Sequence, residues 1–213
     1  MKDFREEVRR KENIASSFLF ALLSLVLFAF ALDPTRINLN VSGSGLLWLV
    51  ILFAGSIFMG ASFRKETENG TIYALLLGPC DRSAIYAAKF LVNLVFLLFL
   101  EALVLSMAAF FLDFRPGPGL PALATIWIAV SIGYSAVGTL FAALMSRLRG
   151  GEVIYPILLF PVLIPLFIGA ATLTQSALTP AFSWSDHWLR LILLYDILFL
   201  AACTVLFEYA VEE

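Results

Sequence analysis

Residues 90–112 read FLVNLVFLLFLEALVLSMAAFFL, an apolar run of 23 residues that contains one charged side chain, Glu101. A helix needs about 20 predominantly apolar residues to cross the hydrocarbon core of a bilayer, so this run predicts a membrane span. Five more runs of 18 to 24 residues have the same character, at residues 14–32, 46–63, 122–145, 153–173 and 189–207. The sequence therefore predicts an all-α integral membrane protein in which residues 1–213 form one transmembrane domain of six spans.

The composition excludes an ordinary water-soluble fold. Hydrophobic residues make up 61% of the 213 positions and charged residues only 14%, whereas a soluble domain carries about 25% charged residues. The mean hydropathy is +0.94. With 14 basic against 16 acidic residues, the chain has no basic field for nucleic acid. Two cysteines and one histidine offer no metal-ligand spacing, so we predict no metal site and expect His187 to be an interfacial residue, a haem ligand being the alternative.

Basic residues near the span ends predict the orientation of the chain, because Lys and Arg resist translocation. Eleven lie on the side of the two termini and three, Arg36, Arg115 and Arg190, lie on the opposite side. Both termini are therefore expected in the cytoplasm. Residues 2–11 pair acids with bases at i,i+4 spacing, which predicts a short interfacial helix on the cytoplasmic leaflet. A signal peptide with a cleavage site at residues 29–31 is the alternative interpretation.

The connection between the second and third spans contains a short apolar segment. Residues 72–77 form an apolar segment that is too short to span, and Gly78-Pro79 ends it. We expect this segment to lie against the cytoplasmic face, beside acidic residues, as a docking surface for a soluble partner. The alternative is an interfacial turn with no partner. The candidate docking residues are Glu66, Glu68, Gly70, Leu75, Leu76, Leu77 and Pro79.

Two carboxyl groups and one amide interrupt the spans. A charged residue at the centre of a span costs about 2.5 to 3.5 kcal/mol on insertion scales, so Glu101 and Asp196 require a polar environment. Asn93 precedes Glu101 by eight residues, about 80° away around a helix, and the two are expected to face one polar seam, with Asp196 as a further candidate. The functional interpretation is a substrate or proton path. The alternative is a neutral carboxyl that hydrogen-bonds to a neighbouring helix.

The fifth span carries Pro156, Pro161 and Pro165, each of which lacks an amide donor and disrupts a regular helix. We expect a broken or kinked span here, and we take these prolines as a candidate gate because such segments can line a cavity. Ordinary helix kinks explain them equally well.

No catalytic residue is assigned from the sequence. The chain contains no G-x-x-x-x-G-K-[ST] motif, and its spans show no paired catalytic residues at a motif spacing. Any dependence on ATP must therefore come from another polypeptide.

With these features in view, the chain resembles the CcmB family, haem exporter protein B, which is the ABC-2-type permease subunit of the cytochrome c maturation system. The resemblance covers nearly the whole length and rests on three stretches. The second span opens with Gly45, Leu46, Leu47 and Trp48. The following connection matches at Phe63, Glu66, Glu68, Asn69, Gly70, Leu75, Leu76, Leu77, Pro79 and Lys89. The most specific stretch runs from Gly138 through Leu144 to Arg149, Gly150, Gly151, Pro156, Pro161, Ile164 and Pro165.

The resemblance implies a permease half in the bacterial inner membrane that pairs with a second copy of itself and with a cytoplasmic ABC ATPase. Residues 64–79 would be the coupling helix that the ATPase receives. The chain itself would bind no cofactor, ATP would act through the ATPase, and haem would be the cargo of the complex. A haem-handling membrane protein and a small membrane helper would be further partners, and ATP hydrolysis would drive release of a haem-loaded chaperone.

Two alternatives to this function remain open. The first is a general ABC-2 exporter of another cargo, which would share the architecture. The second is an ATP-independent membrane carrier or scaffold, with Glu101 and Asp196 as its proton relay.

Overall fold

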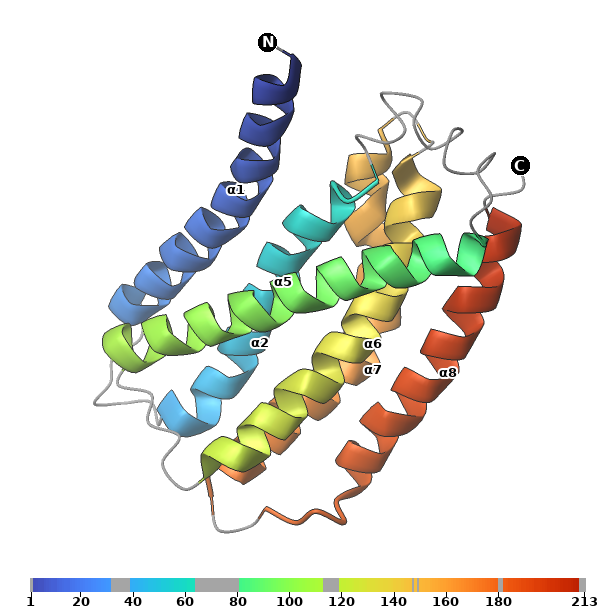
Figure 1. Ribbon diagram of the computed structural model, residues 1–213. Helices are drawn as coiled ribbons and strands as arrows, with labels where there is room; N and C mark the ends of the chain where they lie inside the picture. Colours follow the sequence, from blue (N-terminus) through green and yellow to red (C-terminus); the bar gives the residue numbers. More distant parts are fainter. Residues whose placement is uncertain are drawn as a thin grey trace.

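The computed structural model describes residues 2–31, 39–63, 81–112, 119–146, 148, 150–179 and 182–210. Over these residues the chain forms a bundle of helices without strands (Figure 1). The helices are α1 (Lys2–Ala31), α2 (Leu39–Gly60), α5 (Arg82–Phe111), α6 (Leu120–Ser146), α7 (Gly151–Ala177) and α8 (His187–Ala210). Each of the six contains a stretch long and apolar enough to cross a membrane. The predicted all-α class with six spans is confirmed for the described part of the chain.

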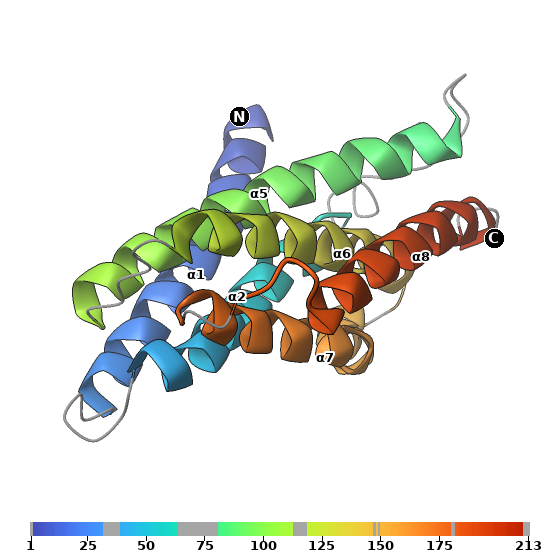
Figure 2. The same cartoon turned by 90° about the horizontal axis from the view of Figure 1, so that it is seen from below.

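Helix α6 is the centre of the bundle. It packs against α2, α5, α7 and α8, and Figure 2 shows it between α5 and α7. Small residues such as Gly133, Ser135, Ala136 and Gly138 let the neighbouring backbones approach closely, and every residue from 133 to 140 is buried. In contrast, only 17% of the α1 span is buried, against 72% for α6. Most of the α1 surface is therefore left to lipid or to another polypeptide.

Helix α5 crosses the bundle obliquely (Figure 1). Its 30 residues measure about 45 Å at 1.5 Å per residue, which exceeds the hydrocarbon thickness of about 30 Å. A helix of this length must tilt or extend beyond the hydrocarbon. Its first turn lies beside the end of α8, and its last turns reach the end of α1, so it contacts four other helices: α1, α2, α6 and α8.

The prediction of a separate interfacial helix at the N-terminus is wrong. Helix α1 runs without a break from Lys2 into the first span and ends at Ala31. Residues 2–13 contain neither glycine nor proline, so no residue in this stretch interrupts the helix that the apolar run continues. The start of α1 and the end of α8 lie at the same end of the bundle, as an even number of spans requires (Figure 1).

The fifth span was predicted to be broken or kinked at its prolines, and the structure contradicts the break. Helix α7 is a continuous helix of 27 residues with Pro156, Pro161 and Pro165 inside it. A proline removes the hydrogen bond to the carbonyl four residues earlier and its ring crowds that carbonyl, but the amides of the other residues remain as donors. Packing of α7 along α2, α6 and α8 holds it in place.

Two adjacent glycines make the turn between α6 and α7. Gly150 has φ +77°, a left-handed conformation that favours glycine. Gly151 has an ordinary φ, but a side chain there would overlap the carbonyl of Met145 at the end of α6. The second glycine of the Arg149-Gly150-Gly151 stretch is therefore required for space, whereas the first is required for backbone conformation.

Candidate functional site at the base of residues 64–80

The seven candidate docking residues, from Glu66 to Pro79, lie outside the residues that the structure describes. The structure does describe both ends of the connection that carries them, at Phe63 after α2 and at Asp81 before α5. Five side chains gather there, and we call them the segment base. They are Phe63, Arg82, Tyr86, Lys89 and Phe207.

Lys89 ties the start of α5 to the end of α2. After Gly60 the chain makes a tight turn, in which the amide of Ser62 donates to the carbonyl of Met59 at 2.9 Å. The carbonyl of Ser62 accepts a 2.7 Å hydrogen bond from Nζ of Lys89, whose charge lies 5.0 Å from the centroid of the Phe63 ring. A cation at a helix C-terminus satisfies exposed carbonyls and interacts favourably with the helix dipole.

An aromatic cluster joins the same point to α6 and α8. The ring of Phe207 on α8 lies 6.0 Å from that of Phe63 and 5.4 Å from that of Tyr86, measured between centroids. The Tyr86 hydroxyl donates to the carbonyl of Ala136 on α6 at 3.0 Å. These three aromatic side chains are almost completely buried. The ends of α2, α5 and α8 are thus packed together on one part of α6.

Arg82 adds a contact at the rim of the segment base. Its Nη1 lies 3.4 Å from the backbone carbonyl of Glu208, in the last turn of α8. The bond is long and exposed, so it contributes less than the Lys89 contact. It places the first residue of α5 beside the end of α8.

Asn93 and Glu101 both face α6 from α5. Nδ2 of Asn93 donates to Oγ1 of Thr139 at 2.8 Å, and Oγ of Ser131 donates to Oε1 of Glu101 at 2.8 Å. The partners are eight residues apart on each helix, as antiparallel neighbours require. Oδ1 of Asn93 and Oε2 of Glu101 are buried without a hydrogen-bond partner among the described residues. This interface is polar and closely packed.

Asp196 lies at a different interface. It is buried on α8 against Gly133 of α6, where a Cβ added to the glycine would overlap Oδ1 of the carboxyl group. On α6, Ser131 bonds Glu101, and Gly133 follows two positions later. Two positions correspond to roughly 200° around the helix. Glu101 and Asp196 therefore approach α6 from opposite sides, and the three candidate polar residues are not brought to a single seam.

The candidate gate prolines differ in their surroundings. Pro156 is half-buried at the wall of a cleft near the start of α7, whereas Pro161 and Pro165 are exposed on the helix surface. His187 is exposed at the first position of α8. Within the described residues, no group of three or more His, Cys, Asp or Glu side chains is arranged to hold a metal ion.

A match to a known protein family identifies the family of this chain. The family model described as CcmB protein matches residues 1–212. The chain belongs to the CcmB family.

Several proteins named heme exporter protein B are similar to this chain. That of Rhodobacter capsulatus is 27% identical over 179 residues, which is 82% of this chain and 79% of that protein. That of Pseudomonas aeruginosa is 26% identical over 170 residues, covering 80% and 76% of the two chains. The Escherichia coli K12 protein is 26% identical over 175 residues, covering 82% and 79%. Each match spans most of both proteins.

The sequence pattern did not reveal every member of the segment base. Phe207 is one apolar residue among many in the last span. Ser62, which accepts the Lys89 bond without being a member of the segment base, does so only through its backbone carbonyl. A polar contact of Lys89 could be predicted from the sequence, because a lysine at the edge of an apolar run must place its charge at a polar group. Which carbonyl accepts it depends on the fold of this CcmB-family chain.

Replacing Lys89 with methionine is expected to loosen the segment base. The change keeps the length and apolar stem of the side chain but removes the charged hydrogen bond to Ser62 and the cation–π contact with Phe63. A charge-assisted bond contributes about 1.5 kcal/mol or more, so tryptic cleavage after Arg64 and Lys65 is expected to accelerate about tenfold. Limited proteolysis of the purified protein measures this rate. Lys89→Arg, which keeps the charge, serves as the control, and equal rates in Lys89→Met and the wild type would refute the role of the lysine.

Proposed function

We propose that this chain is the permease subunit of an ABC transporter complex that acts in haem export for cytochrome c maturation. Membership of the CcmB family and the names of its relatives, heme exporter protein B, support this function. The observation that carries it is the segment base, because a permease driven by another protein needs a firm link between its docking segment and its spans. Lys89 bonds the Ser62 carbonyl and Tyr86 bonds the Ala136 carbonyl, close to the two ends of the connection that would carry the docking segment.

The proposed mechanism begins at residues 64–79, which the resemblance assigns to the coupling helix. ATP-driven closure of the ATPase subunits pushes on this helix. Glu66, Glu68 and Gly70 would shape the docking turn, Leu75 to Leu77 would fill an apolar groove of the ATPase, and Pro79 would end the helix. This chain supplies the docking surface, and hydrolysis of ATP takes place on the partner.

The segment base is positioned to carry this push into the bundle. A displacement of residues 64–80 acts on both ends of the connection, which Lys89 ties together. The contacts of Tyr86 with Ala136 and Phe207 pass the displacement to α6 and α8. In α7 the three prolines leave backbone carbonyls without helical partners, which lowers the bending stiffness of that helix. We propose that α7 moves during the cycle and acts as the gate.

The complex that this mechanism requires is larger than one chain. We propose two copies of the permease with the cytoplasmic ATPase, both permease termini in the cytoplasm, and a place in the bacterial inner membrane. A haem-handling membrane protein and a small membrane helper would complete it, and hydrolysis would release a haem-loaded chaperone. Deleting the gene tests the cargo, since loss of all c-type cytochromes is expected. Intact cytochromes together with loss of another exported compound would favour the general ABC-2 exporter.

Neutralising the two buried carboxyls is expected to leave function intact. Gln at position 101 keeps an oxygen that accepts the Ser131 hydroxyl, and Asn at position 196 is nearly the same size as the aspartate it replaces beside Gly133. We predict holo-cytochrome c levels within about twofold of wild type for Glu101→Gln and Asp196→Asn, as expected for buried structural groups. Complementation of a deletion strain measures this. A proton-coupled carrier predicts the opposite result, because a relay cannot work with groups that no longer exchange protons.

A further inference from the structure

Helix α7 lies at the edge of the bundle and turns one side outward (Figure 2). The exposed residues between positions 157 and 168 cover an arc of about 120° on a helix of 3.6 residues per turn. We call this set the proline face. Its members are Ile157, Leu158, Pro161, Ile164, Pro165 and Ile168. All six side chains are apolar, so the only polar groups on this face belong to the backbone.

Two backbone carbonyls on the proline face have no donor within α7. In an α-helix a carbonyl accepts from the amide four residues later, but residues 161 and 165 are prolines and carry no N–H. The carbonyls of Ile157 and Pro161 therefore lose their helical donors. Among the described residues, the side-chain hydrogen bond to a carbonyl of this stretch comes from Tyr195 and reaches Val162 instead, at 3.1 Å.

Both carbonyls lie at the depth of the hydrocarbon. Helix α7 has 27 residues, and its middle is residue 164. At 1.5 Å per residue, Pro161 is about 5 Å and Ile157 about 10 Å from that middle, within the hydrocarbon half-thickness of about 15 Å. Lipid chains offer no hydrogen-bond donor, and backbone without internal partners is tolerated at this depth only against protein or a water-filled cavity. The proline face therefore requires a covering that supplies donors.

Neither water nor the same face of a second copy suits this requirement. A bound water needs two to four polar partners, and the side chains of the proline face provide none. The same face of a second copy brings two more acceptors and no donor. Surface hydroxyls on other spans, at Ser106, Thr125 and Thr204, already donate their protons to carbonyls four residues earlier in their own helices.

We propose that the proline face binds a transmembrane helix of a different protein, whose Ser, Thr, Asn, Gln, Tyr or Trp side chains donate hydrogen bonds to the carbonyls of Ile157 and Pro161. Polar side chains bond across helices in membranes in this way. Proline and the β-branched isoleucines have little rotamer freedom to lose, so packing against them is entropically inexpensive. The inference goes beyond the proposed function, because it assigns a partner surface and does not depend on ATP-driven movement of α7.

Photocrosslinking of the full chain in its native membrane identifies the partner. A benzophenone amino acid replaces Ile157, or Leu198 on α8 in the control. The two side chains are exposed to similar extents, 63% and 62%, and both lie inside their spans. At position 157 the expected product joins this chain to a different membrane protein, through a transmembrane segment that carries a hydrogen-bond donor. At position 198 we expect lipid adducts.

Restoring the missing amides tests the hydrogen bonds themselves. Alanine in place of both Pro161 and Pro165 supplies N–H donors to the two carbonyls and favours the helix, so the variant is expected to fold. The carbonyls are then satisfied within α7 and no longer need the partner. Recovery of the crosslinked protein in mild detergent is expected to fall about tenfold, as loss of two membrane hydrogen bonds implies.

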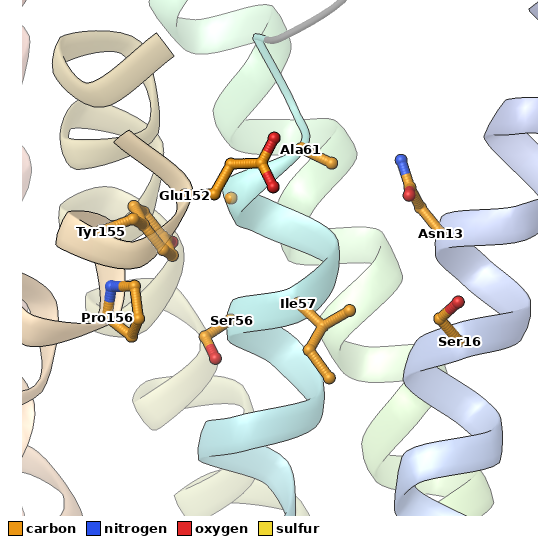
Figure 3. A pocket seen from close by; sticks show the side chains of 9 residues that line it. Asn13, Ser16, Ser56, Ile57, Ala61, Glu152, Tyr155 and Pro156 are labelled. Carbon is orange, nitrogen blue, oxygen red and sulfur yellow. The ribbon is translucent and has the colours of Figure 1, made fainter. Parts of the chain in front are cut away.

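Pro156→Ala is the matched control for this variant. Pro156 faces α2, where it lines a cleft together with Ser56 and Ile57 (Figure 3). The carbonyl that it deprives of an amide belongs to residue 152, about 18 Å from the middle of α7 and outside the hydrocarbon. Partner recovery in Pro156→Ala should therefore equal that of the wild type.

A double-mutant cycle connects the two sides of the contact. Replacing the crosslinked donor of the partner with alanine should lower recovery as the alanine pair at positions 161 and 165 does. The two changes combined should lower it no further, because both remove the same hydrogen bonds. Additive losses would show that the donor does not bond these carbonyls.

Three other results would overturn the proposal. Lipid adducts alone at position 157, or a crosslink between two copies of this chain, would remove the different protein from the proline face. Equal recovery by the wild type and the alanine pair would show that the carbonyls are not bonded by the partner. Labelling of Ile157→Cys by a membrane-impermeant thiol reagent, above the level of the wild type, would place water there instead. None of these results bears on an ATPase at residues 64–79.

Discussion

Replacing Gly151 with alanine is expected to destabilise the protein more than any other addition of one methyl group in the α6–α7 turn. The new Cβ would overlap the backbone carbonyl of Met145, which cannot turn aside as a flexible side chain can. Either α6 loses its last turn or α7 shifts at its start, and we expect a loss of about 3 kcal/mol in the free energy of unfolding. Thermal unfolding in mild detergent, together with the amount of protein in the membrane, measures the effect.

Two further glycine substitutions separate the effect of space at Gly151 from the effect of backbone conformation. Gly150→Ala meets no atom within 4 Å but must adopt φ +77°, so it is expected to cost about 1 to 2 kcal/mol. Gly45→Ala meets no atom within 4 Å, has no left-handed φ and lies inside α2, so its free energy of unfolding is expected to stay the same or to rise by up to about 1 kcal/mol, because alanine favours a helix more than glycine does. If Gly151→Ala unfolded at the temperature of Gly45→Ala, the described packing of the turn would be incorrect.

Replacing Leu76 with aspartate is expected to uncouple the permease from its ATPase without preventing membrane insertion. In the proposed mechanism this side chain enters an apolar groove of the partner, where an unpaired carboxylate would be buried. Loss of about 3 kcal/mol of binding free energy corresponds to an affinity about 100-fold weaker. ATP hydrolysis by the reconstituted complex and holo-cytochrome c levels in cells should both fall to the values obtained without the permease.

The control for this prediction keeps the apolar character of the position. Leu76→Met conserves volume, and exchanges of this kind usually cost less than about 1.5 kcal/mol. It should therefore retain most of the coupled hydrolysis. Normal coupling in Leu76→Asp, at normal protein levels, would remove residues 64–79 from the docking role.

The sequence predicted the helices well because a single property, the length of each apolar run, determines where a span can lie. It predicted their ends and continuity less well. The hydropathy of residues 2–11 differs from that of the first span, yet helix α1 continues through both because no residue there breaks a helix. The prolines of α7 suggested a broken or kinked span, and the helix is continuous through all three.

Only some contacts of the candidate site could be predicted from the sequence. Asn93 and Glu101 lie eight residues and about 80° apart on α5, and both contact α6, at Thr139 and Ser131, a neighbour that the sequence could not name. Asp196 could not be placed by the same means, because the packing of α8 on α6 is a tertiary property. Phe207 joins the segment base from a position 144 residues after Phe63, and no local pattern connects two residues so far apart.

Recovery of partners from the native membrane tests the proposed function of the chain. The tagged wild type and Leu76→Asp are extracted in mild detergent, and the bound proteins are compared by mass spectrometry. The expected result is an ABC ATPase and a haem-handling membrane protein with the wild type, and loss of the ATPase alone in the variant. An ATPase without haem-handling partners would leave a general ABC-2 exporter, and a wild-type chain that recovers no ATPase at all would contradict the permease function.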